Sequence, residues 1–157
     1  MRILFVCMGN ICRSPTAEGV MHALLREEGL DGCIELDSAG TGSWHAGAPP
    51  DARAVAAARG RGITLEGAAR EVSAADFEDF DLLLAMDREN ERDLLARAPD
   101  AAARAKVRLL REFDSEAVAA GDLDVPDPYY RGPHGFEHVL DLVQAACRGL
   151  LDEVRGT

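Results

Sequence analysis

The sequence predicts an α/β fold, with a single domain of three layers in which helices cover both faces of a four-stranded parallel sheet. The unbroken apolar runs Ile3–Val6 and Leu82–Met86 are typical of parallel strands buried on both faces. Each run leads into a predicted helix, and strands that alternate with helices favour a parallel sheet with right-handed crossovers. The chain has 157 residues, so we expect one domain over residues 1–157.

The first half of the chain contributes two strands and two helices to this prediction. A helix is expected from Ser14 or Pro15 to near Gly29, because proline is favoured at the start of a helix. Alternating residues at 34–37 predict a second, more exposed strand, and the turn residues at 38–42 predict a loop after it. An alanine-rich helix follows Pro49-Pro50-Asp51 and should end at Gly60 or Gly62.

The second half begins with a short helix that ends at Phe80, for which Ser73 is the expected cap. Asp87 follows the strand at 82–86 and should cap the next helix. A fourth strand is expected at 106–110. Residues 112–133 show little apolar periodicity and predict a long loop, which suggests a functional segment. Apolar residues at helical spacing over 135–153 predict the last helix.

Composition excludes several classes of function. The net charge of −11 disfavours a nucleic-acid partner, and no apolar stretch approaches the length of a membrane span. The apolar run at the N-terminus is too short for a signal peptide. Four cysteines without C-x2-C spacing argue against structural zinc, and His134 and His138 lack a third ligand nearby, so we expect surface histidines, no metal and no cofactor.

The stretch Cys7–Pro15 lies between the first strand and the first helix. Backbone N–H groups and the helix dipole favour an anion at such a junction. Gly9 and Asn10 tolerate the unusual dihedral angles of a tight anion-binding loop. The sequence therefore predicts that this loop holds an anion.

Cys7 and Arg13 add chemistry to the loop. Cys7 stands at the strand end, in surroundings that favour a thiolate at neutral pH. Arg13 is six positions on and can aim its planar fork at the same anion, such as a phosphate. The pair predicts attack by Cys7 on phosphorus, with a thiophosphoryl intermediate that water hydrolyses, and Ser14 can donate its hydroxyl to the sulfur. A structural cysteine beside an ordinary arginine is the alternative, which the flanking strand and helix disfavour.

The stretch Cys7–Pro15 resembles the nucleophile loop of the bacterial type of the low-molecular-weight protein tyrosine phosphatase family, C-x-G-N-x-C-R-S-P. The resemblance covers nearly the whole chain. It implies the flavodoxin-like phosphotyrosine phosphatase I fold and hydrolysis of phosphotyrosine and small aryl phosphates through a cysteinyl phosphate. It also implies phosphotyrosine proteins as substrates, with a bacterial tyrosine kinase as one candidate. The sequence leaves the oligomeric state open, and a monomer is favoured. The loop residues expected to bind the phosphate are Met8, Gly9, Asn10, Ile11, Cys12 and Ser14.

Asp127 lies between two prolines that stiffen the backbone, and it is the best-placed proton donor for an aryl leaving group. The family has a similar Asp-Pro-Tyr element, which implies that Asp127 is the general acid. The resemblance further implies that Trp44 and Tyr129 form the walls of a slot for the substrate ring, with Tyr130 as a neighbour. A lone tryptophan at the edge of the core is the alternative for Trp44.

Three further residues are expected to support this site. The resemblance implies that Ser38 hydrogen-bonds Asn10, although Ser38 is otherwise an ordinary turn residue. Asp87 caps a helix and, by the same resemblance, supports the far side of the loop. Cys12 lies five residues from Cys7 and is expected to capture an oxidised Cys7 as a disulfide, although a buried cysteine can simply fill space.

Three rival functions remain. Arsenate reductase chemistry on this fold needs further cysteines in a mobile loop, and the sequence has none between Cys33 and Cys147. Family members that act on phosphoarginine have a threonine where this chain has Ile11, whose apolar side chain suits a phenyl ring. A catalytically silent phosphate-binding module is disfavoured by the set Cys7, Arg13 and Asp127.

A reactive thiol needs a reducing compartment, so we expect the cytoplasm. His45 is expected on the surface.

Overall fold

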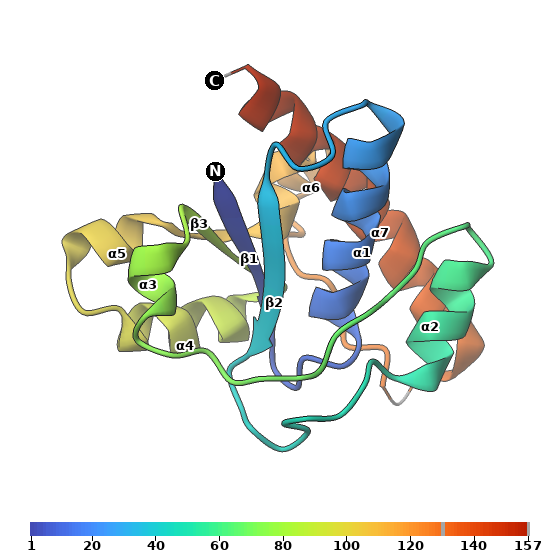
Figure 1. Cartoon of the computed structure of the whole chain (residues 1–157), viewed down its shortest axis with the longest axis horizontal. Coiled ribbons are helices and arrows are strands. Elements are labelled where there is room, and N and C mark those ends of the chain that lie inside the picture. Colours follow the sequence, from blue (N-terminus) through green and yellow to red (C-terminus); the bar gives the residue numbers. More distant parts are fainter. Residues whose placement is uncertain (130, 157) are drawn as a thin grey trace.

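A computed structural model describes residues 1–129 and 131–156 of the chain and confirms the predicted fold, a four-stranded parallel sheet covered by helices (Figure 1). Tyr130, expected beside the substrate slot, lies outside the described residues. The strand order is β2-β1-β3-β4, and all neighbouring strands are parallel. The strands are β1 (Arg2–Cys7), β2 (Glu35–Gly40), β3 (Leu82–Ala85) and β4 (Val107–Leu109).

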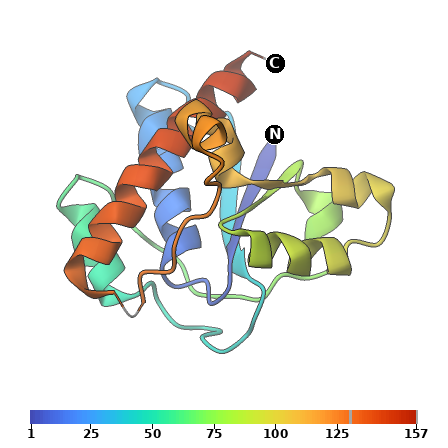
Figure 2. The same cartoon turned by 180° about the vertical axis from the view of Figure 1, so that it is seen from behind.

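Strand β1 separates two apolar cores because its side chains alternate between the faces of the sheet. Ile3 and Phe5 belong to the core beneath α1 (Arg13–Glu27), α2 (Ala52–Arg59) and α7 (Gly132–Arg155). Leu4 and Val6 belong to the core on the other face, where α3 (Asp76–Asp79), α4 (Arg88–Arg97) and α5 (Ala101–Ala105) lie. Figures 1 and 2 show the two groups of helices on opposite sides of the sheet.

Strand β2 is longer than predicted, and Ser38 lies inside it rather than in a loop. Parallel pairing continues to its end, where Ser38 is opposite Phe5 and Gly40 is opposite Cys7. A Cβ at Gly40 would lie only 2.6 Å from the carbonyl oxygen of Met8. The glycine therefore serves a close approach of two backbones, and its turn propensity is overridden by the sheet.

The segment 112–133 is not the structureless loop that we predicted. A 3-10 helix η1 (Leu110–Phe113) and a short helix α6 (Ser115–Ala120) occupy its first part. Asp114 caps α6 by accepting from the Glu116 N–H, and Gly121 ends it with a φ of 71°. Helix α5, which we did not predict, is capped by Asp100 in the same way. Such short helices contain too few apolar positions to show a period.

Other differences concern the ends of elements. Helix α3 begins at Asp76, and the Ser73 side chain does not cap it; instead the Asp76 carboxylate accepts from the Ser73 N–H at 2.8 Å. Asp87 does cap α4, because its carboxylate accepts from the Asn90 N–H. Helix α7 begins at Gly132, earlier than expected, and β4 is shorter than predicted.

Within the described residues no helix is both long and apolar enough to cross a membrane. The described His, Cys, Asp and Glu side chains form no cluster of three that could hold a metal ion. His134 and His138 are both exposed, as expected.

Candidate active site

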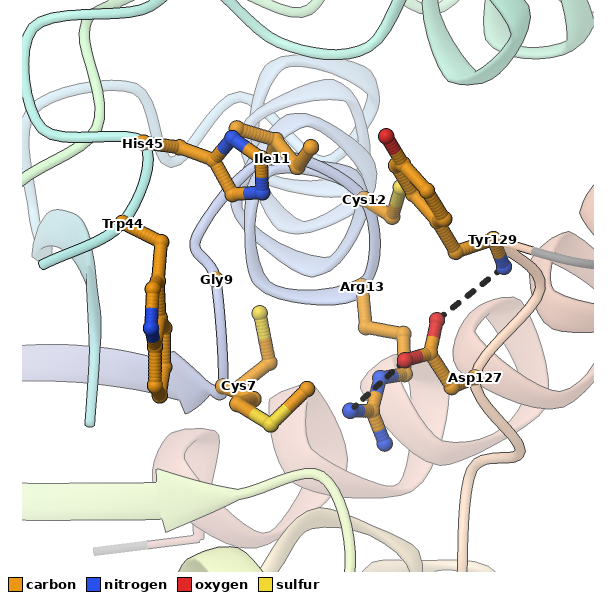
Figure 3. Close-up of a pocket in the computed structure, with 10 residues that line it drawn as sticks. Cys7, Gly9, Ile11, Cys12, Arg13, Trp44, His45, Asp127 and Tyr129 are labelled. Carbon is orange, nitrogen blue, oxygen red and sulfur yellow. Dashed lines mark hydrogen bonds and ion pairs between the residues drawn. The ribbon is translucent and has the colours of Figure 1, made fainter. Parts of the chain in front are cut away.

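Cys7 ends β1 at the carboxyl edge of the sheet and lies at the wall of a cavity of about 330 Å³ (Figure 3). In open α/β sheets this edge is where ligands bind. The structure brings together residues that are far apart in the sequence. The cavity is lined by Cys7, Met8, Gly9, Ile11, Cys12, Arg13, Trp44, His45, Asp127 and Tyr129.

The sulfur of Cys7 is held by two donors, and the residue is only 3% exposed. The Asn10 N–H donates to Sγ at 3.3 Å, and the Ser14 hydroxyl oxygen is 3.0 Å from Sγ. Asn10 Nδ2 donates to Ser14 Oγ at 2.8 Å, so Ser14 can give its own proton to the sulfur, which lies closer than its other acceptor, the Ala39 carbonyl oxygen at 3.5 Å. Both contacts stabilise a thiolate. Asn10 and Ser14 do not line the cavity; their side chains act behind the loop.

Asn10 connects the loop to the rest of the fold. Its φ is 58°, a left-handed conformation that asparagine tolerates better than most residues. Nδ2 donates to Ser38 Oγ at 3.0 Å, which is the hydrogen bond that the family resemblance implies. Oδ1 accepts from the Arg70 N–H at 3.0 Å. The loop is therefore fixed both to β2 and to the segment before α3.

Arg13 is buried at the start of α1 and is held from two sides. Nη1 donates to Asp87 Oδ2 at 2.6 Å and to the Val125 carbonyl at 3.0 Å. Burial acts to lower the Arg13 pKa, but the neighbouring Cys7 and Asp87 outweigh it, and the net shift is upward. The guanidinium thus stays charged. Asp87 both caps α4 and positions Arg13, as expected.

The segment Val125–Tyr129 brings Asp127 to the cavity. The buried Val125 donates its N–H to the Met86 carbonyl at 2.7 Å, directly after β3. Asp127 Oδ1 accepts from the Tyr129 N–H at 3.0 Å, whereas Oδ2 lies 3.9 Å from Arg13 Nη2. A proton on Asp127 therefore belongs on Oδ2, the oxygen nearer Arg13.

Trp44 and Tyr129 lie on opposite sides of the cavity, as the resemblance implies (Figure 3). Trp44 is 72% exposed, so it is not a cap on the core. Its ring packs on Gly42, where a Cβ would lie 1.7 Å from Cζ3. Tyr129 packs against the core on the α7 side of the sheet. The two rings are thus available to flank a ligand.

His45, which was expected on the surface, is half-buried and faces the cavity. It lines the cavity, and its ring centroid lies 6.3 Å from that of Tyr129. A Cβ at Gly9 would lie 3.0 Å from His45 Cδ2, so the ring covers the edge of the loop. The only signal in the sequence was its position next to Trp44.

Glu18 on α1 is a partly buried carboxyl group behind the loop, beside Ser38. Burial raises its pKa to about 7; the Ser38 hydrogen bond opposes the shift, and the neighbouring Asp37 adds to it. The folded pKa lies above the ordinary value of 4.5, so ionisation destabilises the fold as the pH rises from 4.5 to 7.

We expect Glu18→Gln to increase the free energy of unfolding above pH 7, by at most about 3 kcal/mol for a shift of this size. The gain should disappear near pH 4.5, where the carboxyl is protonated in both states. Urea unfolding at pH 8.0 and pH 4.5, by far-UV circular dichroism, measures the difference. Glu27→Gln, at an exposed carboxylate on the same helix, is the control and should change little at either pH. A gain equal at both pH values would contradict the prediction.

The fold and the site define the class of cysteine-dependent phosphatases. Three groups are typical of this class: the sulfur of Cys7 at a strand end, Arg13 at the start of the next helix, and the carboxyl group of Asp127 from a distant segment. These groups provide a nucleophile, an anion clamp and a proton donor at one cavity.

The comparisons with known proteins agree on one family. The model of the family described as low molecular weight phosphotyrosine protein phosphatase matches residues 2–157, and the chain belongs to this family. A low molecular weight protein-tyrosine-phosphatase of Streptomyces coelicolor is 51% identical, over 98% of this chain and 93% of that protein.

Two solved structures are similar over nearly the whole chain. A protein tyrosine phosphatase from Entamoeba histolytica is 38% identical, with a TM-score of 0.93, over 99% of this chain and 97% of that chain. A Drosophila arginine phosphatase is 32% identical, with a TM-score of 0.90, over 99% of this chain and 98% of that chain.

Proposed function

We propose that the protein hydrolyses phosphotyrosine in proteins, and small aryl phosphates, by covalent catalysis at Cys7. The observation that carries the proposal is the convergence of Cys7, Arg13 and Asp127 on one cavity between two aromatic side chains. The relative from Streptomyces coelicolor, named a protein-tyrosine-phosphatase, supports the same substrate.

In the first step the Cys7 thiolate attacks phosphorus, and the bond between phosphorus and the aryl oxygen breaks. Arg13 and the loop N–H groups bind the phosphoryl oxygens, whose charge is spread in the transition state. Asp127 Oδ2 gives its proton to the leaving phenolate oxygen. The products of this step are the phenol and a cysteinyl phosphate, with Asp127 ionised.

In the second step water attacks the phosphorus of the cysteinyl phosphate. The Asp127 carboxylate takes a proton from that water, and the bond between phosphorus and sulfur breaks. The departing thiolate is stabilised by the Asn10 N–H and by the Ser14 hydroxyl, which both contact Sγ. Inorganic phosphate leaves, and both catalytic groups regain their starting protonation.

The shape of the cavity favours a long aromatic substrate. Cys7 is almost completely buried, so a phosphorylated side chain must be long to reach the sulfur. Trp44 and Tyr129 can contact the two faces of a phenyl ring, and an aromatic pair of this kind contributes about 0.5–1.5 kcal/mol beyond the buried area. Ile11 adds an apolar contact at the rim.

Phosphoarginine is the second candidate substrate, because the Drosophila arginine phosphatase is similar over nearly the whole chain. Ile11 argues against it, since its branched apolar side chain crowds a charged guanidinium. We expect a higher kcat/KM for a phosphotyrosine peptide than for the matched phosphoarginine peptide. Ile11→Thr should move this ratio toward phosphoarginine. A preference of the parent enzyme for phosphoarginine would overturn the substrate assignment.

Two other rivals fit the structure less well. Arsenate reduction needs cysteines that relay a disulfide, but Cys33 lies before β2, at the edge of the sheet opposite to Cys7, and Cys147 is completely buried. A silent binding module would bind phosphate without turnover. Release of p-nitrophenol from p-nitrophenyl phosphate distinguishes an enzyme from such a module.

The cellular setting follows from the same chemistry. All four cysteines are free thiols, and a catalytic Cys7 requires a reducing compartment, which favours the cytoplasm. Phosphotyrosine proteins are the proposed partners, with a tyrosine kinase as one candidate, and the enzyme acts as a monomer. Size-exclusion chromatography with light scattering tests the last point.

Cys12 is proposed to protect an oxidised Cys7. It lines the same cavity, and burial, followed by the charges of Asp51 and Cys7, raises its pKa to about 12. Cys12 therefore remains a thiol at neutral pH and is not itself the target of peroxide. Peroxide converts the Cys7 thiolate to a sulfenic acid. Cys12 then displaces the hydroxyl group as water, and a Cys7–Cys12 disulfide forms.

We expect peroxide to inactivate the enzyme, dithiothreitol to restore most of the activity, and inorganic phosphate to slow the inactivation. Mass spectrometry of the oxidised protein should find a Cys7–Cys12 linkage. Cys12→Ser should recover far less activity, because its Cys7 proceeds to irreversible oxidation states. Recovery of this variant to the level of the parent would show that Cys12 only packs. Cys33→Ser, at an exposed cysteine, is the control.

A further inference from the structure

Arg53, in the first turn of α2, connects three parts of the molecule that meet beside the cavity. Its Nε and Nη2 donate to the two carboxylate oxygens of Asp51 at 3.1 and 2.9 Å. Its Nη1 donates to the carbonyl oxygen of Tyr129 at 2.9 Å. The guanidinium carbon also lies 5.0 Å from the ring centroid of Tyr129 and 4.9 Å from that of Phe136.

These contacts form a continuous link across the site. The Asp51 N–H donates to the Ile11 carbonyl at 2.8 Å, which ties Asp51 to the loop that carries Cys7. On the other side, the Tyr129 N–H donates to Asp127 Oδ1. Arg53 therefore stands between the loop that binds phosphate and the segment that carries the proton donor.

Asp127 needs such support because its own side chain is weakly held. It is 41% exposed, and its 3.9 Å contact with Arg13 is longer than a hydrogen bond. The Tyr129 N–H is the hydrogen-bond donor that orients its carboxyl group. Whatever fixes the backbone of Tyr129 thus fixes the oxygen that delivers the proton.

We propose that Arg53 is a positioning residue for the proton transfer, which holds Tyr129 and, through it, Asp127 against the phosphate loop. This inference rests on the proposed function. Arg53 does not line the cavity and acts only through these neighbours. Its planar fork bonds a carboxylate and a carbonyl while its face contacts two rings, a combination that lysine cannot provide.

The test compares two substrates that differ in their need for a proton. Phenyl phosphate has a basic leaving group, phenolate, which needs a proton. The leaving group of 2,4-dinitrophenyl phosphate, dinitrophenolate, departs readily without one. For Arg53→Ala we expect kcat/KM to fall about tenfold or more on phenyl phosphate and less than about twofold on the dinitrophenyl ester. Arg53→Lys retains the charge but not the fork and should show the same selective loss. It also gives the comparison if the alanine variant is unstable.

Chemical rescue is a second measurement. It distinguishes a positioning role of Arg53 from a purely structural one. Guanidinium chloride at concentrations of tens of millimolar, far below those that unfold proteins, should restore part of the lost activity of Arg53→Ala on phenyl phosphate. It should not restore Asp127→Ala. The matched control is Arg61→Ala, because Arg61 also joins the α2 region to α7, through Glu137 and Asp141, but lies outside the cavity lining. This control should leave the ratio of the two substrates unchanged.

The outcomes separate the inference from the proposed function. An equal loss on both esters, or no loss, would show that Arg53 does not position the acid, even though the parent enzyme is a phosphatase. A parent enzyme that hydrolyses neither ester would instead refute the proposed function. A selective loss that guanidinium partly reverses supports the assignment.

Discussion

Replacement of Cys7 by serine is expected to abolish turnover, with a loss of kcat on the order of 10⁴-fold or more on p-nitrophenyl phosphate. The hydroxyl of serine stays protonated at neutral pH, and the Ser14 and Asn10 donors that suit a thiolate cannot ionise it. Initial rates of p-nitrophenol release measure the effect. Activity close to that of the parent would exclude Cys7 as the nucleophile.

The same variant should keep its affinity for substrate, because the anion site does not depend on the sulfur. Arg13 is held by Asp87 and the Val125 carbonyl, and Asn10 fixes the loop through Ser38. Fluorescence polarisation with a labelled phosphotyrosine peptide should therefore detect binding without hydrolysis. A phosphopeptide panel screened in this way would identify the preferred substrates. Cys33→Ser, at the exposed cysteine, should retain full turnover.

The parts of the fold that could be predicted are those whose signal is local. The runs at 3–6 and 82–86 are completely apolar because both faces of these strands are buried, and each became a strand of the central sheet. The loop after β1 was predictable because its functional residues are adjacent in the sequence: Cys7, Arg13 and the residues between them are seven consecutive residues.

The parts that could not be predicted depend on contacts between distant segments. Ser38 and Gly40 read as turn residues, but pairing with β1 places them in a strand. His45 has no motif, and only the approach of its ring to Gly9 and Tyr129 brings it to the cavity. The Val125 carbonyl accepts from Arg13, and the Tyr129 carbonyl accepts from Arg53. Every residue type has a backbone carbonyl group, so the sequence does not reveal which ones take part.

Asp127 illustrates both cases. Its place between two prolines and the family resemblance predicted a proton donor, yet the chain near it contains many other carboxylates. Its neighbour Asp124 has a structural contact instead, because its side chain accepts from the Arg88 N–H. Asp122 is highly exposed and pairs with Arg111. Position relative to the cavity, rather than residue type, distinguishes Asp127.

Asp127→Ala is expected to lower kcat/KM for a phosphotyrosine peptide by a factor on the order of 10²–10⁴, which is typical for loss of a general acid. The loss should be much smaller on 2,4-dinitrophenyl phosphate, whose leaving group needs no proton. Asp122→Ala, on the same segment but outside the cavity lining, is the control and should leave both rates unchanged. Normal turnover of the peptide by Asp127→Ala would assign the proton donor to another group.

The second role of Asp127 makes a further result of the same variant decisive. With the dinitrophenyl ester the first step proceeds without the acid, but hydrolysis of the cysteinyl phosphate still needs a base for the attacking water. The intermediate should therefore accumulate in Asp127→Ala, and mass spectrometry of the acid-quenched enzyme should find one added phosphoryl group on the peptide that contains Cys7. The parent enzyme should show much less of it under the same conditions. Arg13 lies on the same loop as Cys7, and its Nη2 is 3.9 Å from Asp127 Oδ2. An accumulated phosphoenzyme would therefore support, in one experiment, both Cys7 as the nucleophile and Asp127 as the base at the same site.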